Sequence, residues 1–315
     1  MLASGLAAGA AAAVGAAAGC SRMTDGPDHP RGALPIASGV IDGVYHPYGA
    51  ELAGRISASL AGVPPRVHRT GGSVDNLARV IDGTDTFGFS AADVLARTLA
   101  APTGHDLAGL AHIYDDYIHL VVTERSGISS LHELRGKRVS QDLPGSGVEL
   151  VARRVLAVLG MDPHRDVVPV HRHLTDSIAL LRAGHIDAFF WSGGLPTAAV
   201  VRLARTLPIR LLPLGRLGDA MVRRYGPYYR ASMIPNMMYP GVGSVSSLAL
   251  PNYVVTRARV DDGLAYHITR LIIERRDAIA AKVPSANQLD VHNAIQTGAL
   301  DLHPGAARYY RSIKP

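Results

Sequence analysis

Residues 66–89 read RVHRTGGSVDNLARVIDGTDTFGF, and their pattern indicates the fold class. Its residue types predict a strand over Arg66–Arg69, a helix over Val74–Ile81 and a second strand over Thr86–Phe89. A strand, a glycine turn, a helix and another strand form the repeating unit of a parallel sheet covered by helices. We therefore expect an α/β fold.

The same alternation extends in both directions. Upstream, the sequence predicts a strand over Leu34–Ser38 and a helix over Ala50–Leu60, in which Leu52, Ile56 and Leu60 recur at steps of four and form one apolar stripe. Downstream of a break at 101–106, a second unit of similar size is expected. Its predicted helices are 130–134, 148–159, 176–183 and 197–205, and its predicted strands are 138–141, 167–170, 186–191 and 209–213.

Two β-prone runs, Tyr117–Thr123 and Leu248–Thr256, bracket this middle unit. A long amphipathic helix from Asp261 to about residue 281 follows the second run. We infer that the middle unit is inserted into the first, and that both runs cross between two lobes as a hinge near 118–123 and 249–256. The expected division is 34–120 plus 254–315 for lobe 1 and 121–253 for lobe 2, each lobe a sheet flanked by helices.

The composition fits a globular protein with a sizeable core. Of the 315 residues, 47% are hydrophobic and 18% are charged, which excludes a disordered or fibrous chain. Aromatic residues make up only 5%, and the arginines behind the net charge of +6 are spread along the chain, so a nucleic-acid partner is not expected. No segment after the leader is long and apolar enough to span a bilayer.

Cys20 is the one cysteine, and it follows a leader of Ala, Gly, Leu, Val, Ser and Met. The residues Ala17-Ala18-Gly19-Cys20 resemble a bacterial lipobox, so we expect a lipoprotein signal peptide over 1–20, a lipidated Cys20 and a flexible tether over 21–33. The alternative is an Ala-rich leader with an incidental cysteine, because leucine is usual at position 17 and no Lys or Arg precedes the apolar stretch.

Three glycine-rich turns share one local design, in which a strand ends and a helix begins. They are Thr70–Ser73, Pro144–Gly147 and Ser192–Gly194. Glycine lets the backbone approach a ligand, and the helix start offers unpaired N–H groups with partial positive charge. Each turn alone is more often an ordinary helix cap, but three turns from two lobes favour a carboxylate or phosphate site.

Other candidate sites are weaker. None of the serines in these turns fits the Gly-x-Ser-x-Gly elbow of acyl-transfer enzymes. His171-Arg172-His173 is interpreted as solvated rather than as a metal site, Asp115-Asp116 as a solvated or hinge-proximal pair rather than a catalytic dyad, and Met233–Met238 as a packing loop. No catalytic residue, metal or cofactor is predicted.

Taken in order, several motifs resemble the TAXI family, the extracytoplasmic receptors associated with TRAP transporters. The resemblance runs from about Ile36 to Tyr310. Its motifs are Gly43-Val44-Tyr45-His46-Pro47-Tyr48-Gly49, Thr70-Gly71-Gly72-Ser73-Val74-Asp75-Asn76, Leu134-Arg135-Gly136-Lys137-Arg138-Val139-Ser140, Pro144-Gly145-Ser146-Gly147-Val148-Glu149, Ile186-Asp187-Ala188-Phe189-Phe190 with Ser192-Gly193-Gly194 and Pro196, Tyr239-Pro240-Gly241, and Leu302-His303-Pro304-Gly305-Ala306 with Tyr309-Tyr310.

The resemblance implies a two-lobed fold like that of type 2 periplasmic binding proteins, with two hinge crossings, and ligands that lean to amino acids and dicarboxylates. The residues matching motif positions, and so expected to bind the ligand, are Gly43, Tyr45, Gly72, Ser73, Asn76, Asp93, Gly145, Ser146, Gly147, Ser192 and Gly193. Departures include Ala91 before Ala92-Asp93-Val94, where the family often carries Gln, and Trp191, which is bulky for its place.

These observations predict a binding protein rather than an enzyme. The expected protein is a monomeric, lipid-anchored extracytoplasmic receptor that passes a small amino acid or carboxylate solute to a TRAP-type permease in the membrane. One alternative is a solute sensor without transport, and another is an enzyme on the same scaffold. The anionic character of the solute is suggested by the helix starts at the glycine turns.

Overall fold

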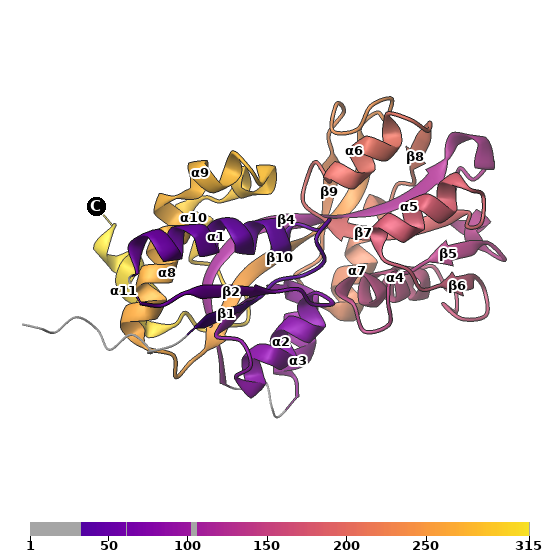
Figure 1. The fold of residues 1–315 in the computed structure, drawn as a ribbon. Coiled ribbons are helices and arrows are strands. Elements are labelled where there is room, and N and C mark those ends of the chain that lie inside the picture. The colour runs from indigo at the N-terminus through magenta and orange to yellow at the C-terminus, as the bar shows by residue number, and fades with distance from the viewer. Residues whose placement is uncertain (1–32, 61, 102–105, 315) are drawn as a thin grey trace, which may run out of the picture.

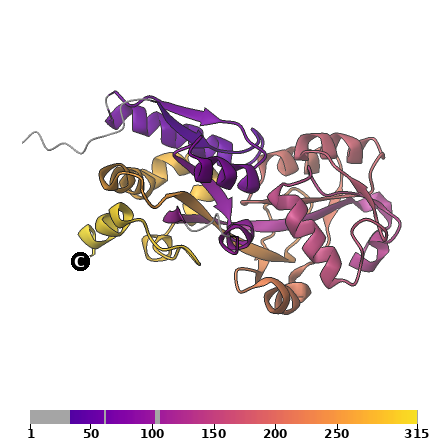
Figure 2. The ribbon, with the colours of Figure 1, turned by 90° about the horizontal axis from the view of Figure 1, so that it is seen from below.

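The computed structural model describes residues 33–60, 62–101 and 106–314. The predicted leader, its Cys20 and most of the tether lie outside these residues. The described chain forms two α/β lobes, which two long strands join (Figure 1). Seen from below, the lobes remain separate bodies on either side of these strands (Figure 2).

One sheet of ten strands runs through both lobes. Its order is β2-β1-β3-β10-β4-β7-β5-β6, with β8 paired to β4 and β9 paired to β10 at one end of the two long strands. The outer strands pair in parallel and the two central strands, β4 and β10, run antiparallel to each other. This is the predicted α/β architecture, with helices packed against the sheet.

Lobe 1 comprises both ends of the described chain. Its strands and helices are β1 (Leu34–Ala37), α1 (Tyr45–Ser59), β2 (Pro65–His68), α2 (Ser73–Asp82), β3 (Phe87–Ala91), α3 (Ala92–Leu99), α8 (Asp262–Glu274), α9 (Arg276–Ala280), α10 (Val291–Ala294) and α11 (Pro304–Ser312). Leu52 and Ile56 of α1 are fully buried, as the predicted apolar stripe requires.

Lobe 2 repeats the alternation on the other side. Its elements are β5 (Arg138–Ser140), α4 (Gly147–Val158), β6 (Val168–Val170), α5 (Leu174–Arg182), β7 (Ala188–Gly193), α6 (Ala198–Ala204), β8 (Ile209–Leu211), α7 (Gly218–Tyr225) and β9 (Arg230–Ile234). A buried core of its own surrounds Phe189 and Val155. Because the core of each lobe is built mostly from its own elements, each lobe can move as a unit about the strands that join them.

The joining strands are β4 (Leu107–Thr123) and β10 (Val245–Arg257). The lobe 1 strand β3 pairs with residues 252–256 of β10, and the lobe 2 strand β7 pairs with residues 117–122 of β4. Between these zones, Asp115 and Asp116 lie opposite Pro251 and Leu250. The predicted lobe boundaries at 120/121 and 253/254 fall close to this crossing and stay a prediction.

Several sequence expectations need correction. Strand β4 begins at Leu107, ten residues before the predicted start, because polar residues such as His112 and Asp115 interrupt the apolar run of a strand that is buried over most of its length. The predicted helix from Asp261 breaks at Arg275, whose backbone leaves the helical region. Met233, predicted to lie in a loop, belongs to β9.

Helix α3 was not predicted at all, although it supplies Asp93 to the centre of the molecule. It follows β3 with no intervening loop residue, so the sequence carries no turn signal between them. Among the described residues, no helix is both long and apolar enough to cross a membrane.

Candidate functional site

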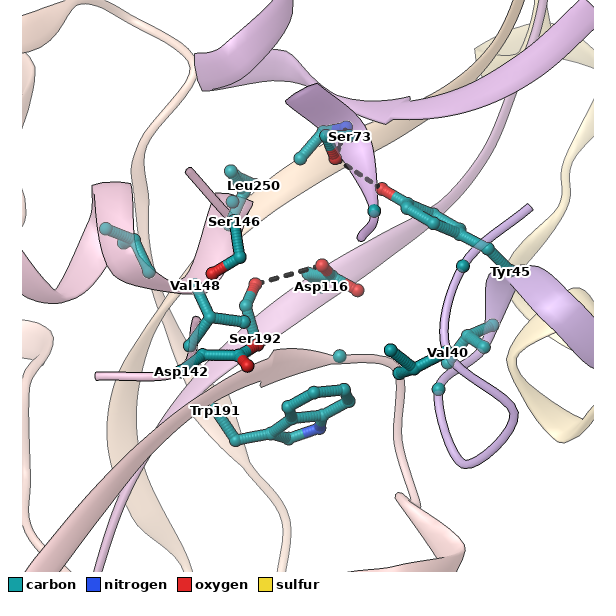
Figure 3. Close-up of a pocket in the computed structure, with 18 of the residues that line it drawn as sticks. Val40, Tyr45, Ser73, Asp116, Asp142, Ser146, Val148, Trp191, Ser192 and Leu250 are labelled. Carbon is teal, nitrogen blue, oxygen red and sulfur yellow. Dashed lines mark hydrogen bonds between the residues drawn. The ribbon is translucent and has the colours of Figure 1, made fainter. Parts of the chain in front are cut away.

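A pocket lies between the two lobes, beside the crossing strands. Its cavity measures about 70 Å³, and both lobes supply its walls. The close-up shows Tyr45 and Ser73 on one side of the space and Ser146, Ser192 and Trp191 on the other, with Asp116 between them (Figure 3). The pocket therefore sits where lobe movement would open or close it.

The start of α2 forms the lobe 1 side of the pocket. Gly72 precedes this helix with φ +100°, a conformation that a side chain would strain, and Ser73 begins the helix. The hydroxyl of Ser73 accepts a hydrogen bond from the backbone N–H of Ala91 at 3.0 Å. It thereby ties the helix start to the end of β3.

Asn76 holds this turn in place from beneath. Its amide Nδ2 donates to the backbone carbonyls of Ser38 and Phe89 at 2.6 and 2.7 Å, and its Oδ1 accepts from the Thr70 hydroxyl. The residue is fully buried and does not line the pocket. Its amide group makes three hydrogen bonds to the protein, so Asn76 positions the glycine turn instead of contacting a solute.

The start of α4 forms the lobe 2 side of the pocket. Ser146 caps the helix by accepting a hydrogen bond from the N–H of Glu149 at 3.0 Å. Gly145, at φ +80°, shapes the turn but does not line the pocket. A Cβ at Gly147 would lie 3.5 Å from the Ser73 hydroxyl, so the two helix starts meet across the gap between lobes.

Tyr45 of α1 closes the pocket from the lobe 1 side. Its ring stacks on Phe89 with 5.4 Å between centroids, and its hydroxyl donates a short hydrogen bond to Asn252 Oδ1. The hydroxyl is also 3.3 Å from that of Ser73. Burial raises the pKa of Tyr45 well above its usual range, so the phenol is neutral and serves as a hydrogen-bonding group.

Asp116 projects into the pocket from β4 at the crossing of the two long strands, which corrects the solvated alternative for Asp115-Asp116 and agrees with the hinge-proximal one. Asp116 is only 5% exposed. Its Oδ2 accepts a hydrogen bond from the Ser192 hydroxyl at 2.9 Å, as the dashed line in Figure 3 marks. Burial raises its pKa to about 7, although the Ser192 hydrogen bond acts in the opposite direction.

Asp93 lines the pocket and also joins the two lobes. Its Oδ2 accepts a 2.7 Å hydrogen bond from the Tyr229 hydroxyl and lies 3.5 Å from the Arg154 guanidinium, both from lobe 2. Burial raises the pKa of Asp93, and these two partners lower it in part. In the loop before α1, Asp42 lies 3.6 Å from Arg202 of α6, which makes a second contact between lobes.

Asp142, a third carboxylate of the lining, follows β5. It has a positive φ of 66°, which aspartate tolerates better than most residues. Its Oδ1 accepts from the backbone N–H of Leu143 at 2.7 Å and lies 3.0 Å from His173 Nδ1. His173 is therefore a partner of a pocket carboxylate, which the sequence interpretation of the 171–173 segment did not foresee.

Trp191, which is bulky for its place in the TAXI pattern, forms part of the lobe 2 wall of the pocket. The indole N–H donates to the Thr197 hydroxyl at 3.0 Å, and the ring is 5% exposed. A Cβ at Gly193 would stand 2.5 Å from this ring nitrogen, so glycine is required for the tryptophan to lie flat along the pocket. Ser192 and Gly193 end strand β7 instead of opening a helix.

The pocket brings together nine of the eleven predicted binding residues. The lining includes Gly43, Tyr45, Gly72, Ser73, Asp93, Ser146, Gly147, Ser192 and Gly193, and leaves out Asn76 and Gly145. Lining residues that sequence reasoning missed include Tyr114, Asp116, Asp142, Val148, Trp191 and Leu250. Asp116 and Leu250 face each other in the crossing register, so alternation along a correctly placed β4 would have found Asp116.

The described part of the chain contains no group of three or more histidine, cysteine, aspartate or glutamate side chains placed to hold a metal ion. The pocket instead combines hydroxyl groups, helix starts and carboxylates with apolar walls. This chemistry suits reversible binding of a small polar molecule.

Comparison with solved structures identifies the fold. The periplasmic aliphatic sulphonate binding protein SsuA from Escherichia coli superposes with a TM-score of 0.50 at 17% identity, covering 91% of this chain and 80% of that one. A Listeria monocytogenes protein named as an L-cystine ABC transporter gives 0.52 at 13%, covering 82% and 98%. An ancestral arginine-binding protein bound to arginine gives 0.51 at 16%, covering 81% and 99%.

The fold is thus that of the type 2 periplasmic binding proteins, with the pocket between the lobes and two strands crossing at the hinge. A family model matches residues 36–313, nearly the whole described chain. The chain belongs to the NMT1-like family.

Proposed function

We propose that the protein is an extracytoplasmic receptor that captures a small, carboxylate-bearing solute between its lobes. The observation that carries the proposal is the meeting of two helix starts, one from each lobe, across one pocket. The backbone N–H groups at such starts lack partners within the helix and favour negative charge. A carboxylate held between α2 and α4 would be bound by both lobes at once.

The serine hydroxyls at these positions can add to the backbone groups. Ser146 and Ser73 each accept a hydrogen bond from a backbone N–H. The hydroxyl hydrogen of Ser73 is directed at Tyr45 and that of Ser146 at Asp142, so each hydroxyl turns away from this partner when it donates to a solute. A ligand that accepts from both helps to close the cleft, because neither lobe alone offers the full set of donors.

The motif order that resembles the TAXI family supports a TRAP-type permease as the membrane partner. Two of the three similar structures are named as binding proteins and one as an ABC transporter, and at 13–17% identity they inform the fold alone. A sensor that reports occupancy without transport would use the same pocket. Uptake of the identified solute by vesicles carrying the permease, only when receptor is added, would separate transport from sensing.

Thermal denaturation and calorimetry with a panel of carboxylates and amino acids test the binding function. A ligand at a hundred times its dissociation constant should stabilise the protein by about 2.7 kcal/mol. Ser73→Leu and Ser146→Leu, which place bulk in the two helix starts, should each weaken binding at least tenfold. Parent-like affinity in both folded variants would refute the proposed site.

We also propose that Cys20 is lipidated and anchors the receptor to the outer face of the cell membrane, because it directly follows an Ala-rich leader. Cys20→Ala should move the protein from the membrane fraction to the soluble extracytoplasmic fraction. Mass spectrometry of the parent should find the lipid on Cys20. Unchanged membrane association of the variant would reject the anchor.

A further inference from the structure

The ionisable carboxyl groups that line the pocket have no cationic side chain among the other described lining residues. Three carboxylates, Asp93, Asp116 and Asp142, contribute to the wall, whereas no lysine, arginine or histidine is among the described residues that line it. Hydroxyl groups and helix starts can receive an anionic group at one end of the space. The carboxylates need groups of the opposite kind, which donate hydrogen bonds or carry positive charge.

Two of the three carboxylates already have such partners within the protein. Asp93 is 3.5 Å from the Arg154 guanidinium, and Asp142 is 3.0 Å from the His173 ring. Asp116 has neither. The Ser192 hydroxyl donates a hydrogen bond to its Oδ2, and the side chains of Asn252 and Tyr114 also act on the carboxylate, but all three of these partners are neutral.

The other carboxylate oxygen of Asp116 has no hydrogen-bond partner among the described residues, although it is out of contact with solvent. The side chain as a whole is 95% buried, since only 5% of it is exposed. Figure 3 shows Asp116 between the side chains of the two lobes, with the oxygen not bonded to Ser192 turned away from that serine. A buried acceptor without a partner is costly unless something else binds there.

We propose that Asp116 receives a protonated amine of the solute, so that the receptor is selective for an amino acid or another ammonium-bearing carboxylate over a dicarboxylate. This inference rests on the receptor function proposed above. The carboxylate of the solute would lie against the helix starts of α2 and α4, and its ammonium group would lie against Asp116 and the Tyr45 side of the pocket. The solute then supplies the cation that the protein omits.

The opposite arrangement is a protonated Asp116 that donates a hydrogen bond to a second carboxylate of the solute. Asparagine reproduces that donor but lacks the negative charge. Asp116→Asn therefore distinguishes the two arrangements. The first predicts loss of affinity for an amine, and the second predicts that affinity for a dicarboxylate survives.

The experiment uses matched solutes that differ by the amine: L-glutamate with glutarate, L-alanine with propionate, and L-leucine with 4-methylpentanoate. Binding to the full chain and to Asp116→Asn is measured by calorimetry, and thermal denaturation confirms that the variant folds. Asp115→Asn removes the same charge one residue away, outside the pocket, and serves as the matched control.

We expect at least one amino acid to bind the parent ten or more times more tightly than its amine-free match. Asp116→Asn should reduce that preference at least tenfold, whereas Asp115→Asn should alter it less than about threefold. Preference for the amine-free member, or an amine preference that persists in Asp116→Asn, overturns the inference and leaves the receptor function standing. Binding of no member of any pair overturns both.

Discussion

Asp115 and Asp116 are neighbours on β4, yet they lie in opposite electrostatic environments. Successive side chains of a strand point to opposite faces of the sheet, so Asp116 faces the pocket and Asp115 faces the back of the hinge. There Asp115 pairs with Arg230 and lies 3.2 Å from His112 Nε2. Burial opposes ionisation of Asp115, but these partners outweigh it and lower its pKa.

The comparison of Asp115 with Asp116 shows which of the two carboxylates lacks a charged partner within the protein. The carboxylate on the back face is paired with the Arg230 guanidinium and lies beside His112, so the protein itself supplies its partners. The carboxylate on the pocket face has a neutral partner, an unsatisfied oxygen and a pKa raised to about 7. An unsatisfied buried charge costs stability, and such groups gather where a ligand completes them. We therefore expect substitutions on the two faces to act in opposite directions.

The largest effect is expected from filling the gap between the helix starts on the pocket face. Gly147→Leu would extend a side chain from a Cβ that is 3.5 Å from both the Ser73 hydroxyl and Val94. The lobes could then not approach as they do here, and we expect solute affinity to fall more than a hundredfold. Calorimetry measures the affinity, and small-angle scattering should show that the variant stays expanded when solute is added.

Gly54→Leu is the matched control for this substitution. Gly54 lies on the exposed side of α1, with no atom within 4 Å of an added Cβ. The control should bind solute as the parent does and compact to the same extent. If Gly147→Leu also closes normally on the solute, the two helix starts do not meet in the bound state, and the proposed site is wrong.

The next largest effect is expected on the stability of the Asp116→Asn variant. Its folded-state pKa of about 7 exceeds the value of about 3.9 in an unfolded chain, so the folded protein holds an extra proton between these two pH values. The contribution of Asp116 to the free energy of unfolding therefore falls as pH rises from about 4 to about 7, and it stays lower above pH 7. Asp116→Asn removes this penalty, and its stability relative to the parent should increase over the same range.

At about 1.4 kcal/mol per pKa unit, the gain at pH 8 relative to pH 4 could reach about 4 kcal/mol in the solute-free protein. Urea denaturation of both proteins at the two pH values measures it. Asp93 and Asp115, whose charges also raise the pKa of Asp116, are common to both proteins, so their own contributions largely cancel in the comparison. An equal stability difference at pH 4 and pH 8 would mean that Asp116 is ionised normally.

Elements that are bounded by turn residues could be predicted from the sequence, whereas elements without such a boundary could not. Strand β5 and helix α4 each lie within a residue of prediction, because a glycine turn marks the boundary between them. Helix α3 and the first ten residues of β4 were missed, since no turn residue separates β3 from α3 and polar side chains interrupt the β4 pattern.

The site divides in the same way. Glycine turns at helix starts are local signals, and they led to Ser73 and Ser146. Asp116 depends on the register of β4 against β10, which is a long-range property that one sequence does not display. The back-face partners of Asp115 come from His112 and from Arg230, more than a hundred residues further on, so its ion pair was equally hidden.

The smallest effect is expected on the back face. The depressed pKa of Asp115 means that the folded state favours its charged form, so its contribution is present above the unfolded-state value and is lost as pH falls through the folded-state value. Asp115→Asn should therefore destabilise the protein at pH 7, and the loss should shrink by pH 3. Arg230 is 52% exposed, so we expect no more than about 1 kcal/mol, as for other exposed pairs. Urea denaturation at pH 7 and pH 3 measures the change. A gain in stability at pH 7, in the direction expected for Asp116→Asn, would remove the contrast between the two faces. If Asp115→Asn destabilises the protein and Asp116→Asn stabilises it at pH 7, then β4 carries one carboxylate that stabilises the fold and another that lowers its stability in the absence of solute.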